Sequence, residues 1–175
     1  MSFDAWVVIV LNSIIGHSRW IDFFWIFVTS YFGYLLIISV VAYWILQKSE
    51  NQNAYRNLLF IFCVMVLSSF IFTEGIHYFW YRLRPFLALS SIQVPYLQAG
   101  SSSFPSGHTA TYFALALGMY QFNKGIGRWY LVGAGLIAIS RIVLGVHYPS
   151  DIIGGIIVAY LSLVIVNKVF TYRLE

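Results

Sequence analysis

Long uncharged runs alternate with short polar segments along the chain, and this pattern predicts membrane-spanning helices. About 20 apolar residues are enough to cross a bilayer, and several runs approach or exceed that length. We expect spans over residues 23–47, 57–81, 105–122, 129–145 and 151–166. Pro95, Gly100 and a run of serines predict a loop before the third span, and residues 123–128 predict a short turn after it.

The N-terminal segment fits this pattern less well. Residues 5–15 are apolar apart from Asn12 and Ser13, but they are too few to cross a bilayer comfortably. A cleaved signal peptide starts with basic residues, whereas the first charge here is Asp4. We therefore expect residues 1–20 to form an amphipathic helix in the membrane interface, with a sixth span as the alternative.

The composition agrees with a membrane protein and excludes several other classes. The chain has 175 residues, of which 60% are hydrophobic and 9% charged, against about 25% charged in an average soluble domain. Ten basic and six acidic side chains give a net charge of +4, too few charges for a nucleic-acid partner. The single cysteine, Cys63, excludes a disulfide framework. We expect one domain, residues 1–175, with an all-α polytopic membrane fold of five or six transmembrane helices.

The basic residues indicate the orientation of the predicted spans. If five helices cross, one membrane face carries Lys48, Arg56, Lys124, Arg128, Lys168 and Arg173, and the other carries Arg19, Arg82, Arg84 and Arg141. Short loops rich in lysine and arginine stay in the cytoplasm. We therefore expect the first face and the C-terminus to be cytoplasmic, and the second face to point to the periplasm or the exterior.

Several ionisable residues lie within or beside the predicted spans, where a charge at a helix centre costs about 2.5–3.5 kcal/mol. They are Glu74, His77, Arg82, Arg84, His108, Arg141, His147 and Asp151. The predicted topology brings Arg84, His108 and His147, which come from separate stretches, to the outer face. Ionisable residues at membrane depth are candidates for function, so we expect a site there.

Part of this set is suited to binding phosphate. Arg84 and Arg141 offer forked donors that match phosphate oxygens. Ser106 and Gly107 open a predicted helix, and the N–H groups at a helix N-terminus form an anion site. The residue types at the outer face therefore indicate phosphoryl chemistry.

The histidines add a nucleophile and a proton donor. Histidine titrates near neutral pH, so His108 and His147 can exchange protons with a substrate. Asp151 follows His147 by four residues, near enough to accept a hydrogen bond from its ring and fix the tautomer. Two other classes remain open: a non-catalytic lipid-phosphate carrier, and a haem or metal protein with His77, His108 and His147 as ligands.

Three motifs in this region resemble the signature motifs of the type 2 phosphatidic acid phosphatase superfamily. They are Arg84-Pro85, Pro105-Ser106-Gly107-His108, and Ser140-Arg141 followed by His147 and Asp151. The first family motif is Lys-x6-Arg-Pro, and this chain has His77 where the lysine stands. Either His77 or Arg82 substitutes for that lysine, or the site works without it. Within the superfamily, the chain is most similar to the undecaprenyl pyrophosphate phosphatase branch.

The resemblance implies an enzyme mechanism and a role for each site residue. His147 attacks phosphorus and forms a phosphohistidine, His108 protonates the leaving oxygen, and Asp151 orients His147. The residues implied to bind phosphate are Arg84, Arg141, Ser106 and Gly107, with His77 and Arg82 as further candidates. The family requires no metal and no cofactor, so we expect none here.

The resemblance also implies a substrate within the bilayer, a lipid phosphate or pyrophosphate. Undecaprenyl pyrophosphate is the first choice, hydrolysed to undecaprenyl phosphate and phosphate at the outer face of the cytoplasmic (inner) membrane. The alternatives are phosphatidylglycerophosphate, phosphatidic acid and the 1-phosphate of lipid A, because the motifs bind the phosphate and not the lipid tail. The expected partners are therefore the membrane and its lipids.

Overall fold

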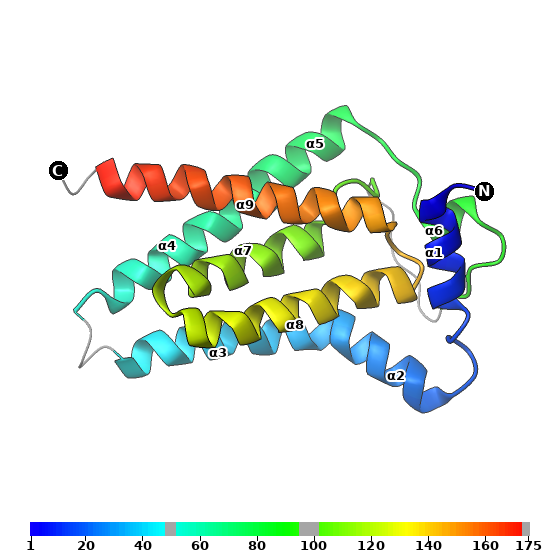
Figure 1. Ribbon diagram of the computed structural model, residues 1–175, viewed down its shortest axis with the longest axis horizontal. Helices are drawn as coiled ribbons and strands as arrows, with labels where there is room; N and C mark the ends of the chain where they lie inside the picture. The colour runs from blue at the N-terminus through cyan, green and yellow to red at the C-terminus, as the bar shows by residue number, and fades with distance from the viewer. Residues whose placement is uncertain (48–51, 95–101, 173–175) are drawn as a thin grey trace.

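The fold is described from a computed structural model, which covers residues 1–47, 52–94 and 102–172. These residues form helices joined by short connections, and no strand occurs in the described ranges. The long helices follow one axis of the molecule, and the N-terminal helix lies across one end of the bundle (Figure 1). Some residues used for the sequence predictions lie outside the described ranges: Lys48, Pro95, Gly100, Ser101 and Arg173.

The helical elements include two π-helical segments, which are continuous with the α-helices beside them. In chain order the elements are α1 (Phe3–Asn12), α2 (Arg19–Phe27), η1 (Val28–Phe32), α3 (Gly33–Leu46), α4 (Ala54–Val66), η3 (Leu67–Thr73), α5 (Glu74–Phe79), α6 (Pro85–Ala88), α7 (Gly107–Phe122), α8 (Lys124–Val143) and α9 (Pro149–Tyr172). The segments α2–η1–α3 and α4–η3–α5 therefore form two long helices.

The predicted all-α membrane bundle is confirmed. Within the described residues, four helices are long and apolar enough to span a bilayer: Arg19–Leu46, Ala54–Phe79, Lys124–Val143 and Pro149–Phe170. The remaining predicted span is α7, which has 16 residues and is about 24 Å long at 1.5 Å per residue. Helix α7 packs against α4, α8 and α9, and its Ala110, Ala114 and Ala116 are fully buried. It is the central helix of the bundle, enclosed by the longer ones.

Several helix boundaries differ from the sequence prediction. The prediction of a turn over residues 123–128 is wrong, because α8 already begins at Lys124. The side chain of Asn123 accepts a hydrogen bond from the backbone N–H of Ile126 (3.0 Å), which caps the new helix directly after α7. The first long helix begins at Arg19, four residues before the apolar run, and the short helix α6 was not predicted.

Two glycines allow helices to approach α7 closely. A Cβ atom at residue 155 would lie 2.8 Å from the backbone oxygen of Ser106, so Gly155 permits α9 to contact the segment that opens α7. A Cβ atom at residue 33 would lie 2.0 Å from the ring of Tyr112, so Gly33 permits the first long helix to pack against α7. Such close helix approach at small residues is common in membrane proteins. These contacts position the N-terminus of α7, which carries the Ser106-Gly107-His108 motif.

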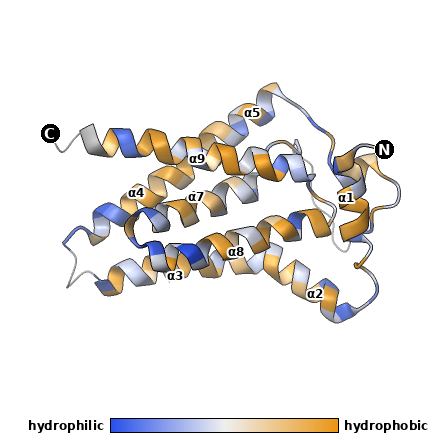
Figure 2. Ribbon diagram, in the orientation of Figure 1, coloured by the Kyte–Doolittle hydropathy of each residue, from blue (hydrophilic) through white to orange (hydrophobic). Residues whose placement is uncertain are grey.

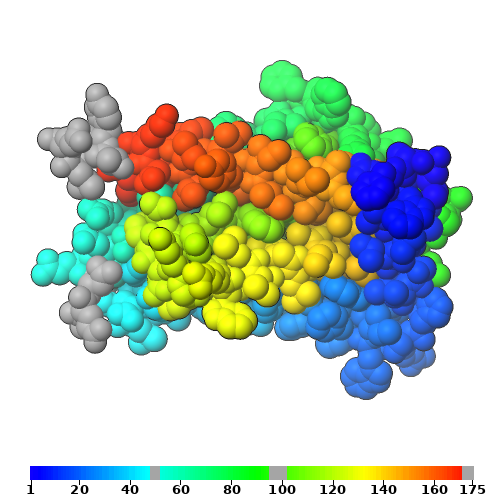
Figure 3. Space-filling model, viewed as in Figure 1, coloured from blue at the N-terminus to red at the C-terminus, as the bar shows by residue number. Residues whose placement is uncertain are grey.

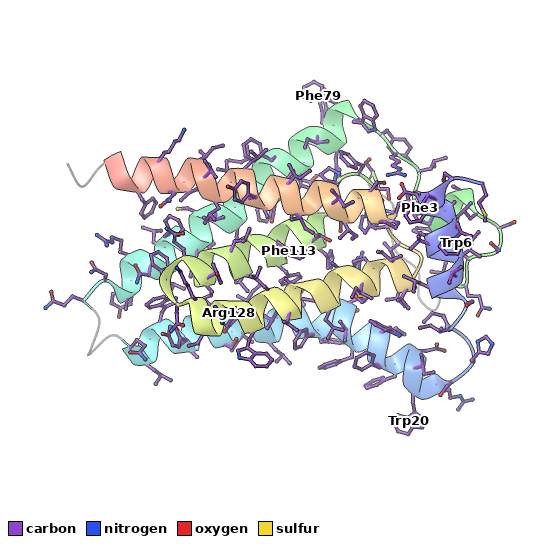
Figure 4. All side chains as sticks on the ribbon, in the orientation of Figure 1. Phe3, Trp6, Trp20, Phe79, Phe113 and Arg128 are labelled. Atoms are coloured by element: carbon purple, nitrogen blue, oxygen red, sulfur yellow. The ribbon has the colours of Figure 1, made fainter. Side chains whose placement is uncertain are left out.

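The outer surface is rich in large apolar side chains. Trp20 is 83% exposed and Phe79 is 86% exposed, and both project away from the bundle (Figure 4). Hydrophobic positions occupy most of the length of the long helices, and hydrophilic positions gather near the turn between α7 and α8 (Figure 2). Exposed aromatic residues are typical of the water–lipid interface of membrane proteins. The distribution agrees with a helix bundle that is surrounded by lipid.

Helix α1 covers one end of this bundle. It packs against α8 and α9 and hides the ends of both helices in the space-filling view (Figure 3). Val8 of α1 is fully buried in a cluster with Ala138, Ile142, Tyr148 and Ile152. Helix α1 has ten residues, so it is shorter than the helix expected over residues 1–20 and shorter than a sixth span would be. Its interfacial location stays a prediction.

Candidate active site

The structure brings the three sequence motifs together at the end of the bundle that α1 covers. His147 lies in the connection between α8 and α9 and is acted on by the charges of Arg141 and Arg84. His108, at the start of α7, lies within the electrostatic influence of Arg141, His147 and Arg84. Asp151 lies in the first turn of α9. The predicted convergence of the motifs at one end of the bundle is therefore present in the fold.

The imidazole ring of His147 is buried and is held by a backbone oxygen. Its side chain is 3% exposed, and its Nδ1 lies 2.8 Å from the carbonyl oxygen of Ser103. A carbonyl oxygen can only accept a hydrogen bond, so this contact requires the proton on Nδ1 and leaves a lone pair on Nε2. The nearest Asp151 oxygen is 3.6 Å from Nδ1. The nearest hydrogen-bond acceptor of the His147 ring is therefore the carbonyl oxygen of Ser103, where we expected the carboxylate of Asp151.

Asp151 is connected to this contact through Ser103. Its fully buried carboxylate accepts hydrogen bonds at Oδ2 from the Ser103 hydroxyl (2.5 Å) and from the backbone N–H of Tyr148 (2.7 Å). At Oδ1 it accepts a hydrogen bond from Arg82 (2.5 Å). A buried carboxylate needs such donors to remain charged. Asp151 thus holds the residue whose carbonyl oxygen orients His147.

The environment keeps His147 unprotonated. The pKa of His147 is lowered from 6.5 to about 4, mainly by burial and also by the charges of Arg141 and Arg84. Asp151 acts in the opposite direction and raises this pKa. At neutral pH the ring is therefore uncharged, which is the state that a nitrogen nucleophile requires.

This shift predicts the pH dependence of the reaction. We expect the acid limb of the kcat/KM profile to lie below pH 6.5, because His147 becomes protonated only near its lowered pKa. Replacing Asp151 by Asn removes an influence that raises the pKa, so the limb should move to still lower pH. Phosphate release measured across the acid range checks both statements, with Glu74→Gln as the matched control. An acid limb at or above pH 6.5 in the wild-type protein would contradict this assignment.

The N-terminus of α7 has backbone groups of the kind that bind anions. Ser106 is its N-cap and accepts hydrogen bonds from the backbone N–H of Thr109 (3.4 Å) and from the Thr109 hydroxyl (3.0 Å). The backbone N–H of Ser106 donates to the carbonyl oxygen of Asp151 (3.0 Å), which ties α7 to α9. Helix geometry leaves the N–H groups of Gly107 and His108 without intrahelical acceptors. These groups and the helix dipole favour a negatively charged ligand.

The two histidines differ in accessibility. His108 is partly exposed, and its ring lies edge-on to that of Tyr112, with centroids 6.2 Å apart. His147 is enclosed. A partly exposed imidazole can exchange protons with water, whereas an enclosed one is protected from it. The arrangement therefore fits His108 as the proton-transfer group and His147 as the nucleophile.

The two predicted phosphate-binding arginines are buried beside the histidines. Arg141 is 1% exposed, and its Nη1 donates to the hydroxyl of Thr29 (2.6 Å). Thr29 lies in the π-helical segment η1, and such segments occur frequently at functional sites. Arg84 is also buried and directly precedes Pro85, the first residue of α6. The fold thus places two forked cations at the end of the bundle where α7 begins.

His77 and Arg82 contact protein groups at the edge of the site. His77 Nε2 donates to the carbonyl oxygen of Pro105 (2.9 Å), which supports the segment that opens α7. Its Nδ1 lies 3.9 Å from a carboxylate oxygen of Glu74. The guanidinium group of Arg82 donates to three acceptors in the described residues: Ser150, Asp151 and Asp4. Its contacts are those of a structural cation, and a direct phosphate contact of Arg82 stays a prediction.

Sequence reasoning missed several residues of the site. They are Asp4, Thr29, Ser103 and Ser150. Ser103 belongs to the serine run that we interpreted only as a loop, two residues before Pro105. The proximity of Ser103 to the second motif in the sequence was the signal that could have identified it as a site residue. Thr29 and Asp4 carry no local signal, because both reach the site through tertiary contacts.

Comparison with known proteins places the chain in a family. The family model of the PAP2 superfamily matches residues 58–175. The chain is 31% identical to the bacitracin transport permease protein BcrC of Bacillus licheniformis, over 78% of the chain and 65% of that protein. That alignment spans slightly less than two thirds of the relative. The chain is 27% identical to the undecaprenyl-diphosphatase BcrC of Bacillus subtilis, over 85% of the chain and 75% of that protein.

Two further similarities extend this result. The chain is 28% identical to the lipid A 4'-phosphatase of Porphyromonas gingivalis, over 80% of the chain and 66% of that protein. The crystal structure of Aquifex aeolicus LpxE has the same fold, with a TM-score of 0.75 over 96% of both chains at 22% identity. Together with the four helices long enough to span a bilayer, these findings identify an integral membrane protein. The chain belongs to the PAP2 superfamily.

Proposed function

We propose that this protein is a lipid phosphatase that transfers a phosphoryl group to His147 and then to water. One observation carries the proposal: the ring of His147 is buried, and the Ser103 carbonyl oxygen holds its proton on Nδ1, which leaves the lone pair of Nε2 available. A carrier that only binds phosphate needs cations but has no use for an oriented, uncharged imidazole. The buried arginines are compatible with a phosphatase and with a carrier, whereas the oriented histidine favours the phosphatase.

In the proposed reaction, Nε2 of His147 attacks phosphorus as the bond from phosphorus to the leaving oxygen breaks. His108 gives a proton to that oxygen. Water then attacks the phosphohistidine, His108 accepts a proton from the water, and phosphate leaves. Arg84, Arg141 and the N-terminus of α7 stabilise the negative charge on the transferring group, which is the main catalytic term in phosphoryl transfer. No step requires a metal ion or a cofactor.

The proposed substrate is undecaprenyl pyrophosphate, which would be converted to undecaprenyl phosphate and phosphate. The similarity to the undecaprenyl-diphosphatase of Bacillus subtilis, over most of the chain, supports this choice. The relative in Porphyromonas gingivalis acts on lipid A, which keeps lipid A phosphate among the alternatives, with phosphatidylglycerophosphate and phosphatidic acid. All of them present a phosphate group at the end of a lipid, which the site can bind in the same way.

We also propose that the protein lies in the cytoplasmic membrane with its site facing outward and its C-terminus in the cytoplasm. The starts of α4 and α8 and the end of α9 lie at the end of the bundle opposite α1 (Figure 1). These regions carry Arg56, Lys124, Arg128 and Lys168. Short basic connections stay in the cytoplasm, so the opposite end, with the site, faces the periplasm or the exterior.

The substrate proposal is tested by phosphate release from several lipids in parallel. Detergent-purified protein is given undecaprenyl pyrophosphate and phosphatidylglycerophosphate in the presence of EDTA, with the His147→Ala variant as the blank. We expect activity to survive the chelator and kcat/KM to be higher for the prenyl lipid. Release only from the glycerolipid would contradict the substrate but keep the mechanism. Absence of release from both lipids, and then from phosphatidic acid and lipid A phosphate offered in the same way, with folded protein, would favour the carrier instead.

A further inference from the structure

Helix α1 precedes the region that the PAP2 family model matches, yet it contacts the site directly. The matched region begins at residue 58, whereas α1 comprises Phe3–Asn12. Asp4, in the first turn of α1, accepts a hydrogen bond at Oδ2 from Arg82 Nη2 (2.9 Å). The same carboxylate accepts hydrogen bonds from the hydroxyl and from the backbone N–H of Ser150. Asp4 therefore joins α1 to the start of α9.

Arg82 links this carboxylate to the buried one beside His147. Its Nη2 contacts Asp4, while its Nη1 donates to Asp151 (2.5 Å) and to the Ser150 hydroxyl (2.7 Å). The guanidinium group also stacks on the ring of Tyr148, with its Cζ atom 4.2 Å from the ring centroid. A guanidinium group is planar and rigid. Contacts on both of its arms and on its face therefore determine where it meets Asp151.

Asp4 and Arg82 are both charged at neutral pH. Burial opposes the charge of Asp4, but hydrogen bonds from Ser150 and Arg82 outweigh it and hold the pKa of the Asp4 carboxyl below its ordinary value. Burial likewise opposes the charge of Arg82, and the two carboxylates outweigh it and raise the pKa of Arg82. The contact between Asp4 and Arg82 is thus an ion pair. Through the other arm of the Arg82 guanidinium group, this ion pair connects α1 to Asp151 in the interior of the site.

We propose that Asp4 is a positioning residue for catalysis: it holds Arg82 on Asp151 and thereby fixes the contact between Ser103 and His147. The chain of contacts runs from Asp4 through Arg82 and Asp151 to the Ser103 hydroxyl, and from the Ser103 carbonyl oxygen to His147. The proposal rests on the proposed function, because it requires His147 to be the nucleophile. It makes α1 a part of the catalytic apparatus rather than only a membrane anchor.

A second anchor holds α1 in place independently of Asp4. The side chain of Asn12, which is buried, donates to the carbonyl oxygens of Gln93 and Val143 (2.9 Å each) and accepts from the N–H of Gln93 (2.8 Å). Val8 is also buried, in a cluster with residues of α8 and α9. A substitution at Asp4 should therefore leave α1 docked and change only the position of Arg82.

The first test compares Asp4→Asn with Asp22→Asn. Asp22 is a matched control because it lies in the first turn of α2, accepts a hydrogen bond from the N–H of Gly16 (3.0 Å) and makes no contact with Arg82. We expect Asp4→Asn to lower kcat by about 10- to 100-fold with KM unchanged, as for the loss of a group that orients a catalytic residue. Asp22→Asn should retain the wild-type kcat. Equal kcat values for the two variants, or a raised KM with normal kcat, would overturn the proposal.

The second test asks whether Asp4 acts through Arg82. Arg82→Lys keeps the charge that Asp151 requires but removes the fork that reaches both carboxylates. If Asp4 works only by holding that fork, Asp4→Asn should lower kcat no further in the Arg82→Lys background. If the double variant instead loses kcat by the product of the two single-variant factors, Asp4 and Arg82 act independently. That result would overturn the proposal.

Failure of this inference can be told from failure of the proposed function. If His147→Ala keeps the wild-type rate, the proposed function itself is wrong. If His147→Ala is inactive while Asp4→Asn behaves as Asp22→Asn does, the function stands and only the positioning role of Asp4 is lost.

Discussion

Replacing His147 by alanine is expected to lower the rate of phosphate release by a factor on the order of 10⁵, as for the loss of other enzyme nucleophiles. The substitution removes the nitrogen that attacks phosphorus and leaves only the groups that bind the transferring phosphoryl group. It also leaves the buried carbonyl oxygen of Ser103 without the donor that it has in the structure. The measurement is kcat for the purified variant, together with its elution profile and thermal stability.

A matched control separates this effect from a general consequence of losing a histidine. His17→Ala changes an exposed residue between α1 and α2 and should retain full activity. A folded His147→Ala variant with a rate within about tenfold of the wild type would rule out His147 as the nucleophile, because removing a nucleophile costs far more than that.

The second large effect is expected at Arg141. Arg141→Lys retains the positive charge but loses the planar fork that can donate to two phosphate oxygens at once. We expect kcat/KM to fall by about 10²–10³, which is the usual cost of removing one donor that stabilises a transition state. The hydrogen bond from Arg141 to Thr29 (2.6 Å) would also be lost, so the first long helix should be held less firmly against α8.

Arg128→Lys is the matched control for this substitution. Arg128 lies on the same helix, near the end away from α1 (Figure 4), and its side chain is exposed. We expect no change in kcat/KM there. Wild-type activity of Arg141→Lys would mean that the guanidinium fork is not needed at the site, and that the arginine acts only as a buried charge.

The fold could be predicted from hydropathy because the bilayer requires long apolar helices with satisfied backbone groups. The exact ends of the helices could not. The sequence predicts a turn at Lys124 and Arg128, yet both residues lie in α8, because the side chain of Asn123 caps this helix at its start. A helix can continue through charged residues after it leaves the membrane. The apolar run in the sequence is then shorter than the helix that contains it.

The chemistry of the site was predictable to the extent that it depends on residue type. Arg84, His108, Arg141, His147 and Asp151 have side chains that are costly near a membrane, and they form motifs with fixed spacing. Ser103 was not predictable in the same way, because it orients His147 with its backbone oxygen, which every residue has. The sequence therefore predicted Asp151 as the partner of His147 and missed the residue between them.

Asp4 illustrates a different limit. It lies 146 residues from Ser150 and 78 from Arg82, and no local pattern connects these positions. In the sequence its charge served only as an argument against a signal peptide. Its contacts depend on how α1 docks on the bundle, which is determined by tertiary packing around Val8 and Asn12.

The most direct test of the central claim is to trap the phosphorylated enzyme. The protein is quenched during turnover of a lipid that is labelled in its terminal phosphate, and its peptides are mapped under conditions that preserve phosphohistidine. We expect the label on His147, and more of it in a His108→Gln variant, because that variant activates water poorly in the second step. Steady turnover with no label on His147, or with label on another residue, would contradict the mechanism.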